Sequence, residues 1–84
     1  MSWYVYILRC SDGTLYTGCT NDLEKRLSAH NSGAGAKYTR ARRPCALAYW
    51  EPCADRSAAL RREAAVKKLR RADKLRLIGG GRNG

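Results

Sequence analysis

Two tyrosines, an arginine, a histidine and a glutamate are the side chains of this 84-residue chain that are best placed for chemistry. Tyr6 and Tyr16 lie in two short apolar segments, and a phenol can exchange a proton if a cationic neighbour lowers its pKa from about 10. Arg26 and His30 share one face of a helix, where a guanidinium can bind an anion and an imidazole can move a proton. Glu63 is one of three acids between residues 54 and 78, and a carboxylate can hold a divalent cation. These residue types indicate chemistry on an anionic substrate.

The positive charge is concentrated in the second half of the chain. Its 17 lysines and arginines outnumber seven acids, for a net charge of +10. Residues 1–36 are electrically balanced, residues 37–43 carry four positive charges, and residues 54–78 carry nine basic and three acidic side chains. This distribution favours a polyanionic partner, nucleic acid first, over a membrane surface. An inert basic protein is the alternative.

The cysteines and the apolar runs argue against a zinc site and against membrane insertion. Cys10, Cys19, Cys45 and Cys53 form no CxxC pair, and the chain has one histidine, so ligands at zinc spacing are absent. We expect reduced thiols in or near the core of a cytoplasmic protein. No apolar run approaches the ~18 residues of a membrane span, and the run at residues 3–8 is too short for a signal peptide.

The N-terminal part of the chain predicts a β-hairpin. Residues 3–8 and 14–19 are rich in aromatic and β-branched residues, which favours strands. Gly13 favours a three-residue loop at 11–13 with a left-handed last residue. Tyr6 and Tyr16 then share one face of the sheet. The expected strand pairs are Cys10 with Thr14, Leu8 with Tyr16, and Tyr6 with Gly18.

A helix and a third strand follow the hairpin. The segment 20–22 offers N-cap residues, and Glu24 suits a capping box with Asn21, so we expect a helix over 22–30. Leu23 and Leu27 lie four residues apart and are expected to face the core. Residues 31–43 contain glycines and no apolar rhythm, which predicts a mobile basic loop ending at Pro44. Residues 45–50 predict a strand that stops at Pro52.

The C-terminal part predicts helices. Asp55 or Ser57 can cap a long helix that continues through Arg71, with Glu63 at the edge of its apolar stripe. The stripe comprises Ala58, Ala59, Ala65, Val66, Leu69 and Ala72. Residues 73–78 predict a short last helix that the glycines at 79–81 end. We therefore expect one α+β domain over residues 1–78 and a flexible tail over 79–84.

The order of these motifs resembles the GIY-YIG nuclease domain over residues 2–78. Tyr4-Val5-Tyr6 stands for the GIY element and Tyr16-Thr17-Gly18 for YIG, followed by Arg26-x-x-x-His30 and by a helical Glu63. The stretches GAGAKYTR and RREAAVKKL are similar to those of small stand-alone bacterial members. Tyr4 replaces the family's first glycine. The late asparagine of many of these nucleases has no counterpart, because Asn83 lies in the tail.

The resemblance implies a small three-stranded antiparallel sheet flanked by helices, and an endonuclease that cleaves DNA with one Mg²⁺ or Mn²⁺ ion, in a role such as repair or recombination. Glu63 would hold the ion, and Arg26 and His30 would act on the scissile phosphate. Tyr6 or Tyr16 would be the general base, with neither preferred. The residues expected to bind nucleic acid are Lys37, Tyr38, Arg40, Arg42, Arg43 and Lys67.

Three functional hypotheses remain open at this stage. The first is a monomeric metal-dependent endonuclease whose substrate is DNA rather than RNA. The second is a non-catalytic nucleic-acid-binding module that keeps the fold. The third is a basic structural or interaction protein, which the ordered motifs and the localised charge disfavour. Metal-dependent cleavage separates the first from the second, and salt-dependent binding separates the second from the third.

Overall fold

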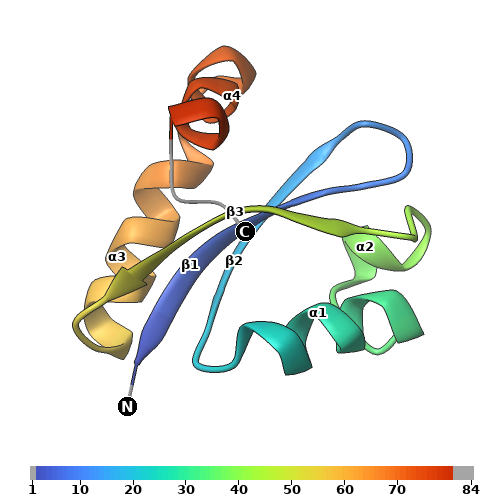
Figure 1. Ribbon diagram of the computed structural model, residues 1–84, viewed down its shortest axis with the longest axis horizontal. Helices are drawn as coiled ribbons and strands as arrows, with labels where there is room; N and C mark the ends of the chain where they lie inside the picture. Colours follow the sequence, from blue (N-terminus) through green and yellow to red (C-terminus); the bar gives the residue numbers. More distant parts are fainter. Residues whose placement is uncertain (1, 81–84) are drawn as a thin grey trace.

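The computed structural model describes residues 2–80 and consists of a small sheet with helices on both of its faces (Figure 1). The three strands are antiparallel and have the order β2-β1-β3, so the expected α+β fold with a three-stranded antiparallel sheet is confirmed. The elements in chain order are β1 (Trp3–Arg9), β2 (Leu15–Thr20), α1 (Leu23–Ser32), α2 (Lys37–Arg40), β3 (Ala46–Cys53), α3 (Arg56–Lys67) and α4 (Arg71–Gly80).

The β1–β2 hairpin has the predicted register. Tyr6 pairs with Gly18, and Leu8 pairs with Tyr16. Gly13 has a φ of 84°, and its amide donates to the Cys10 carbonyl at 2.9 Å, as a three-residue loop with a left-handed glycine requires. This register places Tyr6 and Tyr16 on the same face of the sheet.

The central strand β1 is buried on both faces, which explains its continuous apolar sequence. Alternate side chains face opposite layers. Val5 and Ile7 join a core with α3 and α4, whereas Tyr6 and Leu8 face α1. Figure 1 shows α3 and α4 on one side of the sheet and α1 and α2 on the other. The expected site residues therefore divide between two layers.

The segment after the first helix is more ordered than the sequence predicted. The predicted loop at 31–43 contains the last turn of α1 and the whole of α2. The N-cap of α1 is Asp22, whose carboxylate accepts from the Lys25 amide at 3.0 Å, so the capping box expected from Asn21 does not form. Two side-chain anchors order the segment, because Thr39 is fully buried and Asn31 bonds the backbone of Cys45. Both anchors are polar side chains, so they add nothing to the apolar periodicity from which a helix is predicted.

Strand β3 continues past the predicted stop at Pro52 and ends at Cys53. Because β3 is an edge strand, a proline can be accommodated where its missing N–H would face outward. The pairing of β3 with β1 is irregular between Ile7 and Leu8.

The break between the two predicted C-terminal helices comes earlier than expected, because α3 ends at Lys67 and α4 begins at Arg71. Asp55 is the N-cap of α3, one of the two candidates. The amides of Lys68 and Leu69 bond three residues back, at 3.2 and 3.0 Å, which tightens the chain where Leu69 packs on the core. Of the predicted stripe, Ala59 and Val66 are buried and Ala58 and Leu69 are half-buried, whereas Ala65 and Ala72 are exposed.

Helix α4 includes Gly79 and Gly80, two residues beyond the predicted end at 78. The remainder of the predicted flexible tail, 81–84, lies outside the described residues, as does Asn83. No helix within residues 2–80 has the length and apolar character needed to cross a bilayer.

Candidate active site

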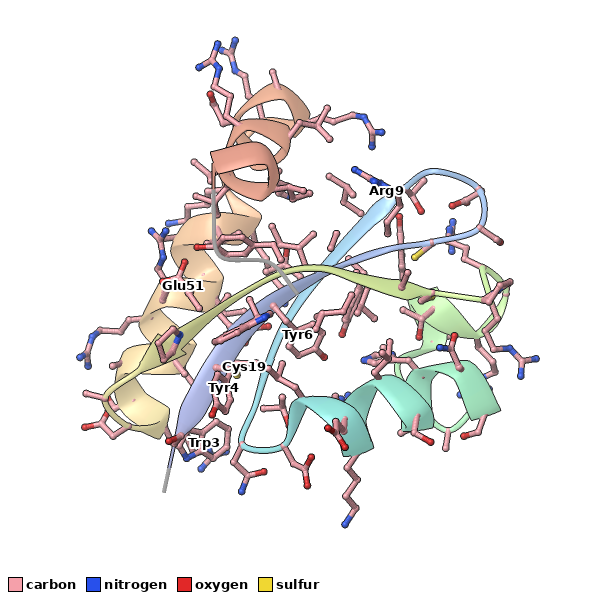
Figure 2. The ribbon with its side chains drawn as sticks, viewed as in Figure 1. Trp3, Tyr4, Tyr6, Arg9, Cys19 and Glu51 are labelled. Carbon is pink, nitrogen blue, oxygen red and sulfur yellow. The ribbon has the colours of Figure 1, made fainter. Side chains whose placement is uncertain are left out.

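Tyr6, Tyr16 and His30 form an aromatic cluster between the sheet and α1. Tyr6 Oη lies 3.0 Å from His30 Nε2, and the Tyr16 ring meets the His30 ring edge-on with centroids 5.3 Å apart. Tyr6 is 2% exposed and His30 is fully buried. Figure 2 shows the Tyr6 ring in the space between the sheet and α1. The hairpin register and the helix therefore bring together three of the expected site residues.

A chain of hydrogen bonds determines which His30 nitrogen carries the proton. Thr39 Oγ1 donates its single proton to the Ala36 carbonyl at 2.9 Å. His30 Nδ1 lies 2.8 Å from the same hydroxyl, so Nδ1 must be the donor and Thr39 Oγ1 the acceptor. In neutral imidazole Nε2 is then unprotonated and accepts from the Tyr6 hydroxyl. Tyr6 is thus joined to a nitrogen that can take its proton.

Burial keeps this pair neutral at rest. It lowers the pKa of His30 below 6.5, and the charge of Arg26 lowers it further. Burial raises the pKa of the Tyr6 phenol, and Arg26 partly opposes that rise. Arg26 is therefore the side chain that favours a phenolate at Tyr6 and disfavours an imidazolium at His30.

Arg26 stands at the open end of the cluster. It lines a surface hollow of about 220 Å³ whose other lining residues are Thr20, Asn21, Asp22, Lys25 and Ala29. The pKa of Arg26 is raised, chiefly by its interaction with Tyr6. A guanidinium beside a hollow can bind a phosphate through two parallel hydrogen bonds. The predicted pairing of Arg26 with His30 on one helix is thus compatible with one side chain binding an anion and the other lying deeper.

Two glycines leave room for the cluster. A Cβ built at Gly18 would lie 2.5 Å from Tyr6 Oη, closer than real side chains approach. The sequence predicted a close approach at Gly18, and the approaching group is the Tyr6 side chain. At Gly35 an added Cβ would collide with His30 Nδ1. These positions fix the depth at which the phenol and the imidazole meet.

The α2 segment covers the outer side of the cluster. The Tyr38 ring stacks on Tyr16, with centroids 5.8 Å apart and an interplanar angle of 27°. Arg42 lies over the Tyr38 ring at 4.0 Å and is paired with Asp12 at 3.1 Å. Arg43 donates to the Arg40 carbonyl at 2.9 Å. Of the predicted nucleic-acid-binding residues, Arg42 and Arg43 therefore hold the α2 segment in place, whereas Lys37 and Arg40 are exposed.

Glu63 lies on the other side of the sheet, on α3. Its carboxylate pairs with Lys67 Nζ at 2.9 Å, and its side chain is 16% exposed. Burial alone would raise the pKa of Glu63, but Lys67 and the Cys19 thiol outweigh it, so the pKa is lowered. Cys19 follows Gly18 in β2 and faces α3, so the edge strand β2 lies between Glu63 and Tyr6. The candidate residues thus form two groups on either side of β2.

The donor set suits a lightly ligated hard cation. Within residues 2–80 no three His, Cys, Asp or Glu side chains gather as a metal cluster. Mg²⁺ is commonly held by one or two carboxylates, with water and phosphate oxygens completing its shell. The single ionised carboxylate of Glu63 fits that mode of binding. The alternative role of Glu63 is structural, as the partner of Lys67 in an ordinary ion pair within a helix.

Sequence reasoning missed the residues that support His30. Thr39 and Gly35 both contact its imidazole, and Asn31 bonds the Cys45 backbone at 2.7 and 2.9 Å. The stretch GAGAKYTR contains Gly35 and Thr39, but no spacing rule connects them to His30.

The cysteines have the predicted reduced form. All four are free, and Cys10 and Cys45 are buried. Cys45 Sγ lies 3.5 Å from Cys10 Sγ.

The chain as a whole is similar in sequence to known proteins. The family model described as the GIY-YIG catalytic domain matches residues 2–76. A UPF0213 protein of Syntrophus aciditrophicus is 59% identical over 76 residues, which cover 89% of this chain and 87% of that protein.

Two solution NMR structures are also similar. UPF0213 protein BH0048 from Bacillus halodurans is 46% identical, with a TM-score of 0.60, over 94% of this chain and 84% of that chain. Protein EF2693 from E. faecalis is 44% identical, with a TM-score of 0.63, over the same shares of the two chains. The family match spans both Tyr6 and Glu63 and almost the whole length of the sheet and helices described above. This chain belongs to the GIY-YIG family.

Proposed function

We propose that this protein is a divalent-metal-dependent endonuclease that hydrolyses phosphodiester bonds in DNA. The observation that carries the proposal is the 3.0 Å contact between the Tyr6 hydroxyl and the unprotonated Nε2 of His30. A phenol with a proton acceptor already in place can become a base toward water. A buried tyrosine hydroxyl needs a hydrogen-bond partner in any role, so the support lies in the kind of partner, a ring nitrogen that can take up a proton.

Tyr6 is the general base in this proposal. As water attacks, Tyr6 takes a proton from it and gives its own proton to His30 Nε2 in the same step, so no separate ion pair of phenolate and imidazolium has to form. Arg26 stabilises negative charge on the Tyr6 oxygen and opposes positive charge on His30, which together with burial keeps the pair neutral until water reacts. The Tyr16 ring packs edge-on against His30 and stacks on Tyr38. Its role is to confine the imidazole and to border the substrate.

Arg26 binds the scissile phosphate from the hollow at the N-terminal half of α1. The guanidinium neutralises part of the charge that builds up as water attacks. The same side chain acts on Tyr6, so substrate binding and base activation depend on one cation.

Glu63 would hold the divalent ion. Its lowered pKa keeps the carboxylate ionised at neutral pH, and Lys67 must turn away to release an oxygen. A bound Mg²⁺ or Mn²⁺ ion supplies charge neutralisation at the phosphate and at the leaving oxygen. The ammonium of Lys67, once released, remains near the substrate as a further positive charge.

Nucleic acid is the proposed partner because the chain has a charge of +10. DNA is preferred to RNA, with a monomer as the working unit and repair or recombination as the context. A cytoplasmic location suits the four free thiols, since a reducing compartment keeps buried cysteines unpaired.

The test is a cleavage panel on single-stranded, duplex and branched DNA with Mg²⁺, with Mn²⁺ and with chelator. We expect cleavage that needs metal and that Arg26→Ala and Glu63→Ala each abolish. Glu24→Ala is the matched control, because Glu24 is an exposed acid on α1. Equal traces of activity in all of these proteins would indicate a contaminant and would refute the proposal.

A non-catalytic nucleic-acid-binding module is the second candidate. The ion pair of Glu63 with Lys67 supports it, because an occupied carboxylate can be purely structural. This candidate predicts salt-dependent binding with no cleavage of any substrate in the panel. It also predicts that Glu63→Ala binds DNA as the unmodified protein does.

A further inference from the structure

A second hollow lies apart from the one beside Arg26. It has a volume of about 240 Å³ and brings together the end of the hairpin, α2 and α4. Its lining residues are Thr14, Leu15, Tyr38, Arg71 and Lys74. We call it the α4 groove.

The α4 groove contains two cations that no acid neutralises within residues 2–80. The ion pairs of the described chain use Arg42, Arg62, Lys67 and Arg76, and neither Arg71 nor Lys74 takes part. Asp73 lies between them in sequence, but its carboxylate pairs with Arg76. No acidic side chain lines the groove. A hollow of this kind attracts an anion.

The groove is better suited to a phosphate than to a base. A nucleobase would stack on an aromatic face, but Tyr38 has Tyr16 on one side of its ring and Arg42 over the ring at 4.0 Å. The Thr14 hydroxyl already donates to Asp12 at 2.6 Å. The charged donors of the groove are those of Arg71 and Lys74, which bind phosphate oxygens without reading sequence.

The groove adjoins the candidate active site along the edge strand β2. Tyr38 borders the groove and stacks on Tyr16, which in turn packs on His30. Leu15 in the groove and Cys19 beside Glu63 are four residues apart on β2, roughly 13 Å along a strand. Phosphates of one nucleic-acid strand recur every ~3.4 Å of helix axis, so one strand can reach both places.

We propose that the α4 groove is a phosphate-binding subsite that holds the backbone of a nucleic-acid strand a few nucleotides from the scissile bond. The proposal rests on the proposed function in taking nucleic acid as the substrate. It adds a direction to that function, because the bound strand follows the β2 edge from the candidate active site toward α4. Contact through phosphates alone also makes this part of the binding independent of base sequence.

The test is binding of a short, labelled single-stranded DNA of mixed sequence, measured by fluorescence anisotropy over a range of salt concentrations in chelator. The groove variant is Arg71→Ala with Lys74→Ala. The matched control is Arg70→Ala with Lys68→Ala, which removes the same charges from exposed positions that do not line the groove. Circular dichroism and thermal melting establish that both variants are folded.

We expect the groove variant to lose two phosphate contacts. The slope of log affinity against log salt then falls by about 1.4, and binding at about 0.1 M salt weakens roughly 25-fold. The control keeps the slope of the unmodified protein. Equal losses in both variants, or no loss in the groove variant, would overturn the subsite, as would an unmodified protein that binds no DNA.

This readout is separate from catalysis, because chelator prevents metal-dependent cleavage during the binding measurement. A protein that binds through the groove but cleaves nothing would retain the subsite and refute the proposed endonuclease. A protein that cleaves DNA but whose groove variant binds normally would retain the proposed endonuclease and refute the subsite. In cleavage assays with metal, we expect the groove variant to raise the substrate concentration needed for half-maximal rate and to leave the maximal rate unchanged.

Discussion

His30 Nδ1 lies 2.8 Å from Thr39 Oγ1, and both side chains are fully buried. Because the Thr39 hydroxyl donates its proton to the Ala36 carbonyl, this contact determines the tautomer of the histidine. Thr39 therefore acts on Tyr6 without touching it, through the imidazole that lies between them. In the proposed mechanism Thr39 is therefore a positioning residue.

Replacing Thr39 tests this relationship. In Thr39→Val the buried Nδ1–H loses its acceptor, so we expect the proton to move to Nε2 and the protein to lose about 1–3 kcal/mol of stability. Nitrogen-15 NMR of the His30 ring reads the tautomer, and cleavage should fall about 10²-fold, as when general-base catalysis is lost. Thr39→Ser keeps the hydroxyl and should restore the Nδ1–H tautomer and most of the activity. A wild-type ring already protonated at Nε2 would contradict the assignment.

The buried histidine also predicts how stability depends on pH. The pKa of His30 is below 6.5 in the folded protein because of burial and Arg26, so the unfolded chain binds a proton first as pH falls. The stability due to neutral His30 is complete above pH 6.5 and is lost as pH falls from there through the folded pKa. Urea unfolding at a series of pH values measures this.

The comparison for that titration is His30→Gln. His30 is the one histidine of the chain, and carboxylates titrate mainly below pH ~5. Between about pH 5 and pH 6.5, the free energy of unfolding of the variant should lack the pH dependence that the unmodified protein shows. Parallel curves for the two proteins would mean that the His30 pKa is unchanged by folding.

Gly18→Ala tests the space that the Tyr6 hydroxyl needs. The added methyl group would lie 2.5 Å from Tyr6 Oη, so we expect the phenol to be displaced and its bond to His30 lost. Cleavage should fall by at least about 10²-fold. Gly79→Ala is the control, because nothing lies within 4 Å of its added methyl group. That change should leave activity intact and raise stability by up to about 1 kcal/mol, since alanine favours a helix.

Thr17 and Thr20 provide a matched pair for stability. Thr17 Oγ1 is the one buried side-chain oxygen or nitrogen without a partner within residues 2–80. We expect Thr17→Val to stabilise the protein by about 1 kcal/mol, because an unsatisfied hydroxyl leaves the core. Thr20 Oγ1 bonds both the amide and the carbonyl of Asp22, so Thr20→Val should destabilise by about 1 kcal/mol or more. Thermal melts of the two variants should shift in opposite directions.

The local parts of the fold were predictable from the sequence. Gly13 alone was enough to predict the length of the hairpin loop, and that length determines that Tyr6 pairs with Gly18. The order of the three strands, the first helix and the C-terminal helices was predicted correctly, because turn residues and apolar periods act over a few positions, whereas α2 was not predicted. The contact of Tyr6 with His30 is a consequence of register and helix face together. Neither the register nor the helix face alone gives the distance between Tyr6 Oη and His30 Nε2.

The rest depends on packing between distant segments. Thr39 reaches His30 because Gly35 lets α2 fold back, and no short-range pattern encodes that return. The break between α3 and α4 follows from the packing of Leu69 on the core, in a stretch whose helical periodicity continues without interruption. The position of Glu63 across β2 from Tyr6 required the two-sided burial of β1, which the sequence shows only as a run of apolar residues.

The proline near the end of β3 has a consequence for the outer edge of the sheet. An edge strand normally offers a row of N–H and C=O groups on which another chain can add a strand. Pro52 has no N–H, so this row lacks one donor where β3 is otherwise open. Two copies of the protein are thereby hindered from joining their sheets at β3, which protects a small basic domain from aggregation by strand addition.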